Sequence, residues 1–217
     1  DQSFIENNIF IFDLNKDFIN EYTKRTINFL YDQSKFLVSI DELCLYQDYN
    51  FHIRWMPSFY KNPKWNEYLK IECGWSNYLL NKPKKVSKII EKFNKKILIL
   101  TGGSDYFRLG QYWPNLIENI VNQPMEIHWV IGPYAEPPRI LINSNHQWVF
   151  HHNIYSFDEL FQKCDYVLLV HGVSLFEAIS AEKLISCFVP PNHIDVFEFD
   201  KLNHFDFIKI TDDIEES

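Results

Sequence analysis

The stretch ILILTGGSD (97–105) decides the fold, because four aliphatic residues are followed at once by a threonine, two glycines and a polar turn. The apolar run is too short for a helix, and it is typical of a strand that is buried on both faces of a sheet. Beyond the turn, Trp113, Leu116, Ile117 and Ile120 share one face of a predicted helix at 112–122. A buried strand, a glycine turn and an amphipathic helix predict an α/β fold with a parallel sheet.

The same unit recurs along the chain. Short runs rich in Ile, Val and Leu predict strands at 9–12, 36–40, 97–100, 126–131, 166–170 and 185–189. Helical patterns lie between them, at 17–31, 86–93, 112–122, 157–163 and 174–183. Strand and helix alternate through most of the chain, as in an α/β protein.

One basic segment interrupts the alternation. The run LNKPKKVSKIIEKFNKK (80–96) is rich in lysine and contains Pro83, as expected of an exposed connector that leads into a helix. We therefore predict two lobes, 1–83 and 84–217. The first lobe has two or three predicted strands and lacks an initiator Met, so we expect it to be incomplete and part of a longer protein. The second lobe has the elements of a complete small α/β domain.

The composition restricts the partners. The 21 Lys and Arg against 29 Asp and Glu give a net charge of −8, which argues against a nucleic-acid binder. No apolar run approaches the ~18 residues of a membrane span, and residues 1–8 carry no base, unlike a signal peptide. Widely spaced cysteines without zinc-type spacing predict free thiols, a cytoplasmic location and no metal; they are Cys44, Cys73, Cys164 and Cys187.

Glycine is scarce, with six residues in 217, and four of the six follow predicted strands. These four are Gly102, Gly103, Gly132 and Gly172. In an open parallel sheet, ligands bind beyond the carboxyl ends of the strands, where glycine lets the backbone approach them. The GGSD turn can therefore cradle a phosphate, although it is neither a Walker loop nor a GxGxxG motif. The alternative is a tight turn without a ligand.

The segment HGVSLFEA (171–178) allows two interpretations. Ser174 and Glu177 fit the S-x-x-E capping box, and Ser156 and Glu159 repeat that spacing. A helix that begins after Gly172 is equally a natural anion site. A carboxylate bound to the backbone has less capacity for a ligand hydroxyl, so the two roles of Glu177 compete.

Several of these segments together resemble a known family. ILILTGGSD (97–105), WVIGP (129–133), 151–170 and 172–190 resemble the C-terminal half of the UDP-sugar hydrolase of pseudaminic-acid biosynthesis. They are also similar to the C-terminal domains of MurG-like GT-B glycosyltransferases. Upstream, IFIFD (9–13), FLVSIDE (36–42) and IECGWSNYLL (71–80) keep the order and spacing of the hydrolase.

The resemblance implies a GT-B-like fold of two Rossmann-like lobes, the N-terminal one incomplete, with a UDP-sugar held by the second lobe without a metal or cofactor. It implies hydrolysis of the UDP-sugar link or glycosyl transfer in surface-polysaccharide or nonulosonate biosynthesis. Gly102, Gly103, Ser104 and Asp105 would face the diphosphate and sugar, and Gly132 and Pro133 would shape the base-binding wall. Gly172, Ser174 and Leu175 would approach the phosphates, and Glu177 would bind the ribose hydroxyls.

The first lobe departs from the family. The hydrolase's catalytic histidine lies in a glycine-rich loop that has no counterpart here, and Leu14-Asn15-Lys16 replaces its His-Tyr-Gly. Catalytic candidates within the chain are Asp105, which would orient a water or sugar hydroxyl, and His171, which would act as a base. Their structural alternatives are a loop cap and a core histidine. We expect the adjacent His151 and His152 to be solvated rather than metal ligands.

Three hypotheses follow. The first is an enzyme of the nucleotide-sugar class. The alternative is a non-catalytic nucleotide-sugar-binding module of a larger protein, as the missing histidine loop favours. The third is an α/β interaction domain whose glycine turns are only structural, which predicts no nucleotide affinity.

Overall fold

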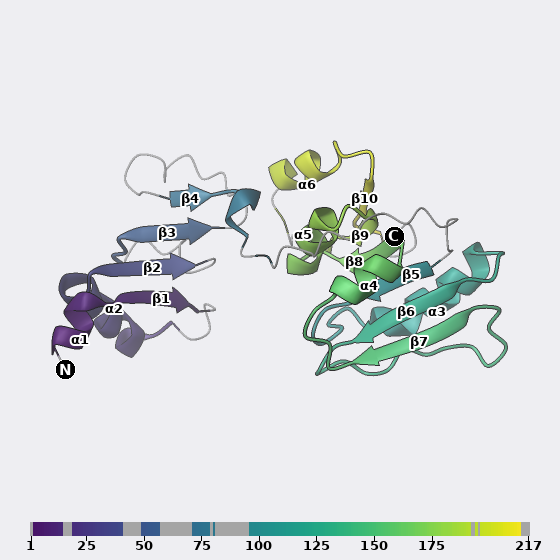
Figure 1. Cartoon of the computed structure of the whole chain (residues 1–217), viewed down its shortest axis with the longest axis horizontal. Helices are drawn as coiled ribbons and strands as arrows, with labels where there is room; N and C mark the ends of the chain where they lie inside the picture. Colours follow the sequence, from purple (N-terminus) through teal and green to yellow (C-terminus); the bar gives the residue numbers. More distant parts are fainter. Residues whose placement is uncertain are drawn as a thin grey trace. The chain divides into compact units, whose positions relative to one another are not determined.

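The computed structural model describes residues 2–14, 19–40, 49–56, 71–78, 80, 96–191, 194 and 196–213. The chain divides into two compact units, Asp1–Leu79 and Leu80–Ser217. Each unit is built on its own parallel sheet (Figure 1), so the predicted α/β class with parallel sheets is confirmed. The predicted lobe boundary at residue 83 and the predicted helix at 86–93 lie outside the described residues.

The first unit contains a four-stranded parallel sheet in the order β1-β2-β3-β4. Its strands are β1 (Ile9–Asp13), β2 (Phe36–Ile40), β3 (Ile53–Met56) and β4 (Ile71–Cys73). Its helices are α1 (Gln2–Asn7), α2 (Glu21–Gln33) and the 3-10 turn η3 (Trp75–Asn77). The expectation of two or three strands was too low, because β3 and β4 are short and carry Arg54 and Glu72 among their apolar residues.

The core of the first unit forms where α2 packs on the sheet. Ile27 and Leu30 of α2 are buried together with Leu37 of β2 and Phe51. The helix begins four residues later than predicted, because the Asn20 side chain accepts a hydrogen bond from the backbone N–H of Thr23 and caps the first turn.

The second unit contains six parallel strands in the order β10-β9-β8-β5-β6-β7. The strands are β5 (Lys96–Leu100), β6 (Glu126–Ile131), β7 (Gln147–His152), β8 (Tyr166–Val170), β9 (Leu184–Phe188) and β10 (Ile208–Thr211). The helices are α3 (Leu109–Ile120), α4 (Asp158–Lys163), α5 (Val173–Ser180) and α6 (Val196–Leu202). The four strands predicted in this unit are confirmed within one residue, whereas β7 and β10 were missed.

The strand order places a reversal of direction at the middle of this sheet. The chain runs outward from β5 through β6 to β7, then crosses back to β8 on the other side of β5 and continues to β10. Ligands of open α/β sheets bind at such a reversal, outside the carboxyl ends of the strands. The carboxyl ends of β5 and β8 are therefore where a site is expected.

Helices cover both faces of the six-stranded sheet. Figure 1 shows α3 on one face and α4 and α5 on the other. On the α3 face, Trp113 packs near Trp129 with ring centroids 6.4 Å apart, within a core that includes Ile99 and Ile127. The helix begins at Leu109 rather than at 112, because the Asp105 side chain accepts hydrogen bonds from the N–H groups of Leu109 and Gly110.

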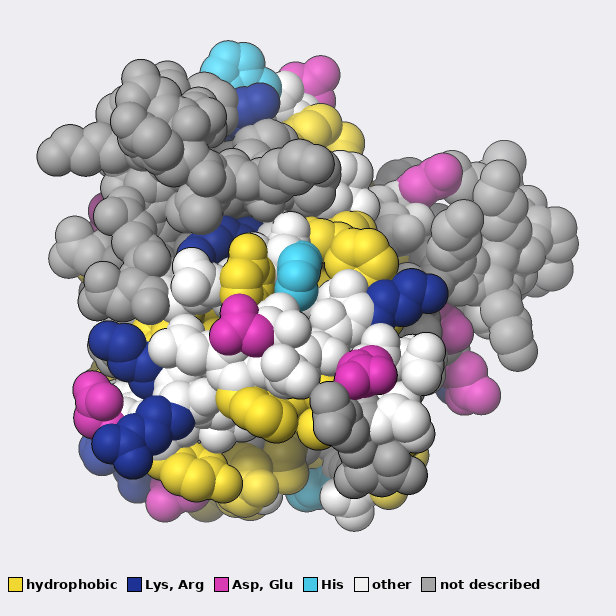
Figure 2. Space-filling model, turned by 90° about the vertical axis from the view of Figure 1, so that its left-hand side faces the viewer, with side chains coloured by type: hydrophobic (Ala, Val, Ile, Leu, Met, Phe, Trp, Pro, Cys, Tyr) yellow, Lys and Arg dark blue, Asp and Glu magenta, His cyan; other side chains and the backbone are white. Residues whose placement is uncertain are grey.

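The surface gives two further facts. Within the described ranges, no helix is long and apolar enough to cross a membrane. On the face shown in Figure 2, acidic and basic side chains of the described residues are scattered among uncharged and hydrophobic ones rather than gathered by sign.

Candidate functional site

Three glycine loops lie at the carboxyl edge of the six-stranded sheet, as the sequence predicted. Gly102 lies two residues beyond β5, Gly132 directly follows β6, and Gly172 lies two residues beyond β8. Because β5 pairs with β8 and with β6, these loops are neighbours on one edge. At the start of the first loop, the Thr101 hydroxyl is buried and has no hydrogen-bond partner in the described part of the chain. A buried polar group of this kind is expected to meet a ligand or water.

The loops after β5 and β6 pack directly on one another. Gly102 adopts a left-handed conformation with φ +83°, which glycine enters without strain. A Cβ placed on Gly132 would lie 2.4 Å from the carbonyl oxygens of both Gly102 and Gly103. The backbone N–H of Tyr134 donates to Gly103 O at 2.9 Å. Gly132 is therefore required for the contact between the two loops.

Asp105 caps α3. It is 9% exposed and has φ +45°, and its Oδ1 and Oδ2 accept from the N–H groups of Leu109 (2.9 Å) and Gly110 (2.8 Å). Burial raises the pKa of Asp105, although the two backbone hydrogen bonds oppose that rise. These bonds begin the helix at Leu109, and they are the loop cap that was weighed against a catalytic role.

A second contact fixes the same helix end to the loop after β6. Pro114 lies inside α3 and has no N–H, so it cannot donate to the carbonyl of Gly110. Instead, the backbone N–H of Arg139 donates to Gly110 O at 2.8 Å. The glycine loop after β5 is thus held from both sides, by Asp105 and by the loop after β6.

The N-terminus of α5 differs from that of α3, because no side chain caps it. The helix begins at Val173 after Gly172, so Ser174 is its second residue and Glu177 its fifth. The capping-box interpretation of Ser174 and Glu177 is therefore wrong. The N–H of Leu175 donates to Gly172 O at 3.0 Å, whereas helix geometry leaves the N–H groups of Val173 and Ser174 without intrahelical acceptors. The side chain of Leu175 is fully buried.

Glu177 lines a hollow beside this helix. The hollow is open to solvent and is lined by Glu177 of α5, by residues 154–158 and by Phe161 of α4. Burial raises the pKa of Glu177, and the negative charge of Asp158 raises it further. Two carboxylates thus lie close together beside a short loop. Such a pocket suits a ligand group that donates hydrogen bonds.

A second hollow is less suited to a specific ligand. It measures about 630 Å³ and lies between α3 and the sheet, lined mainly by apolar side chains such as Trp113 and Ile120. Ligand sites usually add a few convergent polar groups to an apolar lining. Among the described lining residues, polar groups belong to Trp113, Tyr166 and Ser186.

The structure places the predicted site residues in two groups. Gly102, Gly172 and Ser174 follow the central strands β5 and β8, whereas Glu177 is the one predicted site residue among the described residues that line the hollow. Gly132 supports the neighbouring loop, and neither it nor Pro133 lines the hollow. The loop 154–158 was not predicted as part of the site, because the strand that delivers it, β7, was not recognised.

His171 lies directly before Gly172 and is half-buried. Its backbone N–H donates to Phe188 O at 2.8 Å, and its ring meets that of Phe176 edge-on at 6.4 Å. These contacts hold it between β9 and α5, as expected of a core histidine next to the site. They leave its catalytic role a prediction.

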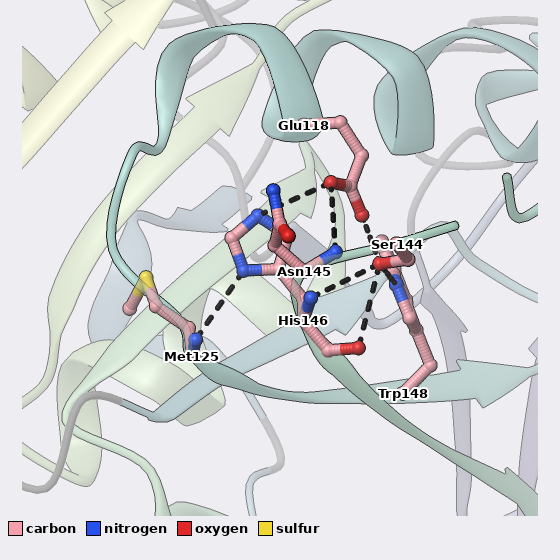
Figure 3. Close-up of polar contacts among 6 residues, drawn as sticks. All are labelled: Glu118, Met125, Ser144, Asn145, His146 and Trp148. Carbon is pink, nitrogen blue, oxygen red and sulfur yellow. Dashed lines mark hydrogen bonds and ion pairs between the residues drawn. The ribbon is translucent and has the colours of Figure 1, made fainter.

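A separate polar cluster lies at the amino end of β7 (Figure 3) and contains residue types that hydrolases use. Ser144 Oγ donates to Glu118 and accepts from Trp148 Nε1 at 2.8 Å. His146 Nδ1 accepts from the backbone N–H of Met125 at 3.3 Å, and His146 Nε2 lies 3.9 Å from Glu118 Oε2. The serine proton is directed at the carboxylate rather than at the histidine, so this cluster clamps its loop to α3 and is no nucleophile–base pair.

The metal and thiol predictions concern only part of the chain. Among the described residues, no group of three His, Cys, Asp or Glu side chains is placed to hold a metal ion. Cys164 and Cys187 are free and buried, and burial raises the pKa of Cys164 to about 12. His151 and His152 differ in their surroundings: His152 is exposed, whereas His151 is half-buried and contacts His128, so it is less solvated than expected.

The chain was compared with protein-family models and with curated proteins. No family model matches the chain, and no curated protein matches it.

Proposed function

We propose that this chain binds a UDP-sugar at the carboxyl edge of the six-stranded sheet. The observation that carries the proposal is the hollow beside Glu177, which lies little more than one helical turn from the uncapped N-terminus of α5. Ribose hydroxyls and the uracil imide are donors that suit the carboxylates of Glu177 and Asp158. A diphosphate is an anion that suits the helix end at Val173 and Ser174.

The fold is consistent with this assignment. The doubly wound order of the second unit is that of nucleotide-binding sheets, whose ligands lie at the reversal between the two central strands. We infer a GT-B arrangement of the two units and kinship with the UDP-sugar hydrolase of pseudaminic-acid biosynthesis and with MurG-like glycosyltransferases. This inference depends on the sequence segments that resemble those enzymes.

The chemistry would be hydrolysis or glycosyl transfer. In both, the bond between the anomeric carbon and the diphosphate oxygen breaks, and the UDP leaves with an additional negative charge. The N–H groups of Val173 and Ser174 would stabilise that charge. A base would take the proton of the attacking water or acceptor hydroxyl, and His171, next to Gly172, is the candidate for this role.

One observation favours a second function, a non-catalytic nucleotide-sugar-binding module. Both carboxylate oxygens of Asp105 already accept backbone hydrogen bonds. The glycine loop therefore presents a capped rather than a free carboxylate towards a bound sugar. A binding module needs the hollow and the helix end but no base.

Calorimetric titration of the full chain with UDP, and with ADP for comparison, tests the binding. We expect micromolar affinity for UDP, about −8 kcal/mol at 1 μM, and weaker binding of ADP. Glu177→Gln keeps the shape but removes the charge and should weaken binding about tenfold, or 1.4 kcal/mol. Glu159→Gln, an exposed position on α4, is the matched control and should bind as the parent does.

The outcomes separate the hypotheses. Absent UDP binding, or equal loss in the two glutamate variants, contradicts the proposed site and leaves an interaction domain. If UDP binds, incubation with UDP-sugars follows. Release of UDP with or without an acceptor identifies an enzyme, whereas binding without turnover identifies the module.

A further inference from the structure

Four polar side chains cross one face of the six-stranded sheet in a continuous series of contacts. Lys96 Nζ of β5 lies 2.9 and 2.8 Å from the two carboxylate oxygens of Glu126. Glu126 Oε1 lies 2.7 Å from His128 Nε2, and His128 Nδ1 lies 2.8 Å from His151 Nε2. The series thus links β5 through β6 to β7. Of the four, His128 is buried, and a buried polar side chain needs hydrogen-bond partners such as these.

The histidine pair is closely packed. His128 is 4% exposed, and its ring is stacked on that of His151 with centroids 5.1 Å apart and an interplanar angle of 14°. The hydrogen bond from Lys96 is the main factor that lowers the pKa of Glu126, so this carboxylate is ionised at neutral pH. It therefore accepts the Nε2 proton of His128. Between the facing nitrogens of His128 and His151 there is room for a single proton.

The charged groups that act on His151 are all positive, whereas the carboxylate of Glu126 lies beside His128. His151 faces His128 on β6, His152 on its own strand and Lys163 on α4. Burial lowers the pKa of His151, and the positive charges of these three groups lower it further. At the Lys96 end, the buried thiol of Cys164 has two charges of each sign around it: Lys96 and Lys183, and Glu126 and Asp165.

The pair lies directly before the loop that lines the nucleotide hollow. β7 ends at His152, Asn153 turns the chain with φ +54°, and Ile154 is the first lining residue. On the other side, α4 contributes Asp158 to the hollow and ends at Lys163, which acts on His151. Two segments therefore connect His151 to the residues that line the hollow: the end of β7 with the loop after it, and α4.

We propose that His151 is a positioning residue for the nucleotide site and that it makes binding sensitive to acid. One proton shared with His128 holds the end of β7 and the loop 153–157 in place. In acid, each ring takes up one further proton from solvent, so that two N–H groups and two positive charges face each other. The rings then separate, the loop moves, and affinity falls. This inference depends on the proposed function, because it concerns the same site.

Titration of the full chain with UDP at about pH 8 and about pH 5.5 tests the proposal. His151→Gln can still hydrogen-bond to His128 but does not titrate, and His204→Gln, at an exposed position outside this series, is the matched control. We expect the parent and His204→Gln to lose several-fold in affinity on acidification, and His151→Gln to lose only what protonation of UDP itself costs. Protonation of UDP itself affects all three proteins equally. An equal acid loss in all three would overturn the proposal.

A readout without ligand separates this inference from the proposed function. In NMR titrations of the imidazole protons, His151 should take up its proton at a lower pH than an ordinary histidine side chain, and His128→Gln should raise the pKa of His151. If UDP fails to bind at either pH while these titrations are as expected, the proposed function fails and the shared proton stands. If His151 titrates in the ordinary range of histidine and is unaffected by His128→Gln, the shared proton is refuted even though UDP binds.

Discussion

The contact between the two glycine loops predicts a graded series of alanine variants. In Gly132→Ala, the new Cβ would lie 2.4 Å from the carbonyl oxygens of Gly102 and Gly103, whereas real Cβ contacts are essentially never under 3.0 Å. The backbone must therefore shift by roughly 0.6 Å (3.0 minus 2.4) against a loop that Tyr134 fixes by a hydrogen bond. Overpacking costs typically ~1–3 kcal/mol, and a clash with two backbone carbonyls belongs at the upper end, about 3 kcal/mol.

The neighbouring glycines are internal controls. A Cβ on Gly103 meets nothing within 4 Å, so Gly103→Ala should change the free energy of unfolding by less than about 0.5 kcal/mol. A Cβ on Gly102 also meets nothing, but the φ of +83° disfavours alanine by about 1 kcal/mol. The expected order of destabilisation is Gly132, then Gly102, then Gly103.

Urea unfolding followed by tryptophan fluorescence measures the series, because Trp113 and Trp129 lie in the core beneath these loops. A loss of about 3 kcal/mol should lower the midpoint of the transition with an unchanged slope. In thermal unfolding it corresponds to a fall of about 10 °C for a unit of this size. If Gly132→Ala were as stable as Gly103→Ala, the packing of the two loops would be refuted, and with it the view that this edge is built rigidly.

Three further predictions concern stability and reactivity. Asp105→Ala should destabilise the second unit by about 1–2 kcal/mol in urea, and Asp105→Asn by less, because only the alanine removes both capping acceptors; equal effects would contradict the cap. Ser144→Ala should lower the free energy of unfolding by about 2 kcal/mol in the same urea measurement, because the Trp148 Nε1–H and the Glu118 carboxylate each lose this partner. An unchanged stability would contradict the view that this cluster holds its loop to α3. At about pH 8, peptide mapping should find Cys164 and Cys187 unmodified by a thiol reagent in the native protein and modified after unfolding, because burial raises the pKa of both thiols.

The strands that could be predicted from the sequence are those buried on both faces. In ILIL (97–100) and YVLLV (166–170), residues 98–100 and 167–169 are buried, so hydrophobicity alone reveals the strand. The missed strand β7 reads QWVFHH and lies at the edge of its sheet, where solvent reaches alternate side chains. β10, at the other edge, is only four residues long and includes an exposed lysine. Edge strands need less hydrophobic sequence, so their signal is weaker.

The residues of the candidate site could likewise be predicted only where they follow a buried strand. The glycines at the carboxyl edge could be found because each follows a strand with a strong signal. The loop 154–158 could not be found, since it follows the weak strand β7. The contact between His128 and His151 could not be found either, because it depends on the register of β6 against β7, in which His151 lies opposite Val130.

The role of Glu177 shows most clearly what spacing leaves open. The pattern S-x-x-E lies at the start of two helices of the second unit, and in neither is the serine the residue directly before the helix: α4 begins at Asp158, two residues after Ser156, and α5 begins at Val173, one residue before Ser174. Ser156 still accepts from the N–H of Asp158 at 3.2 Å, whereas the chain reaches α5 through Gly172 and begins the helix before the serine. The pattern fixes the distance between serine and glutamate but not where the helix begins, which depends on where the preceding strand ends. In α5 that difference of two residues moves Glu177 out of the first turn and into the hollow, where its carboxylate is available to a ligand.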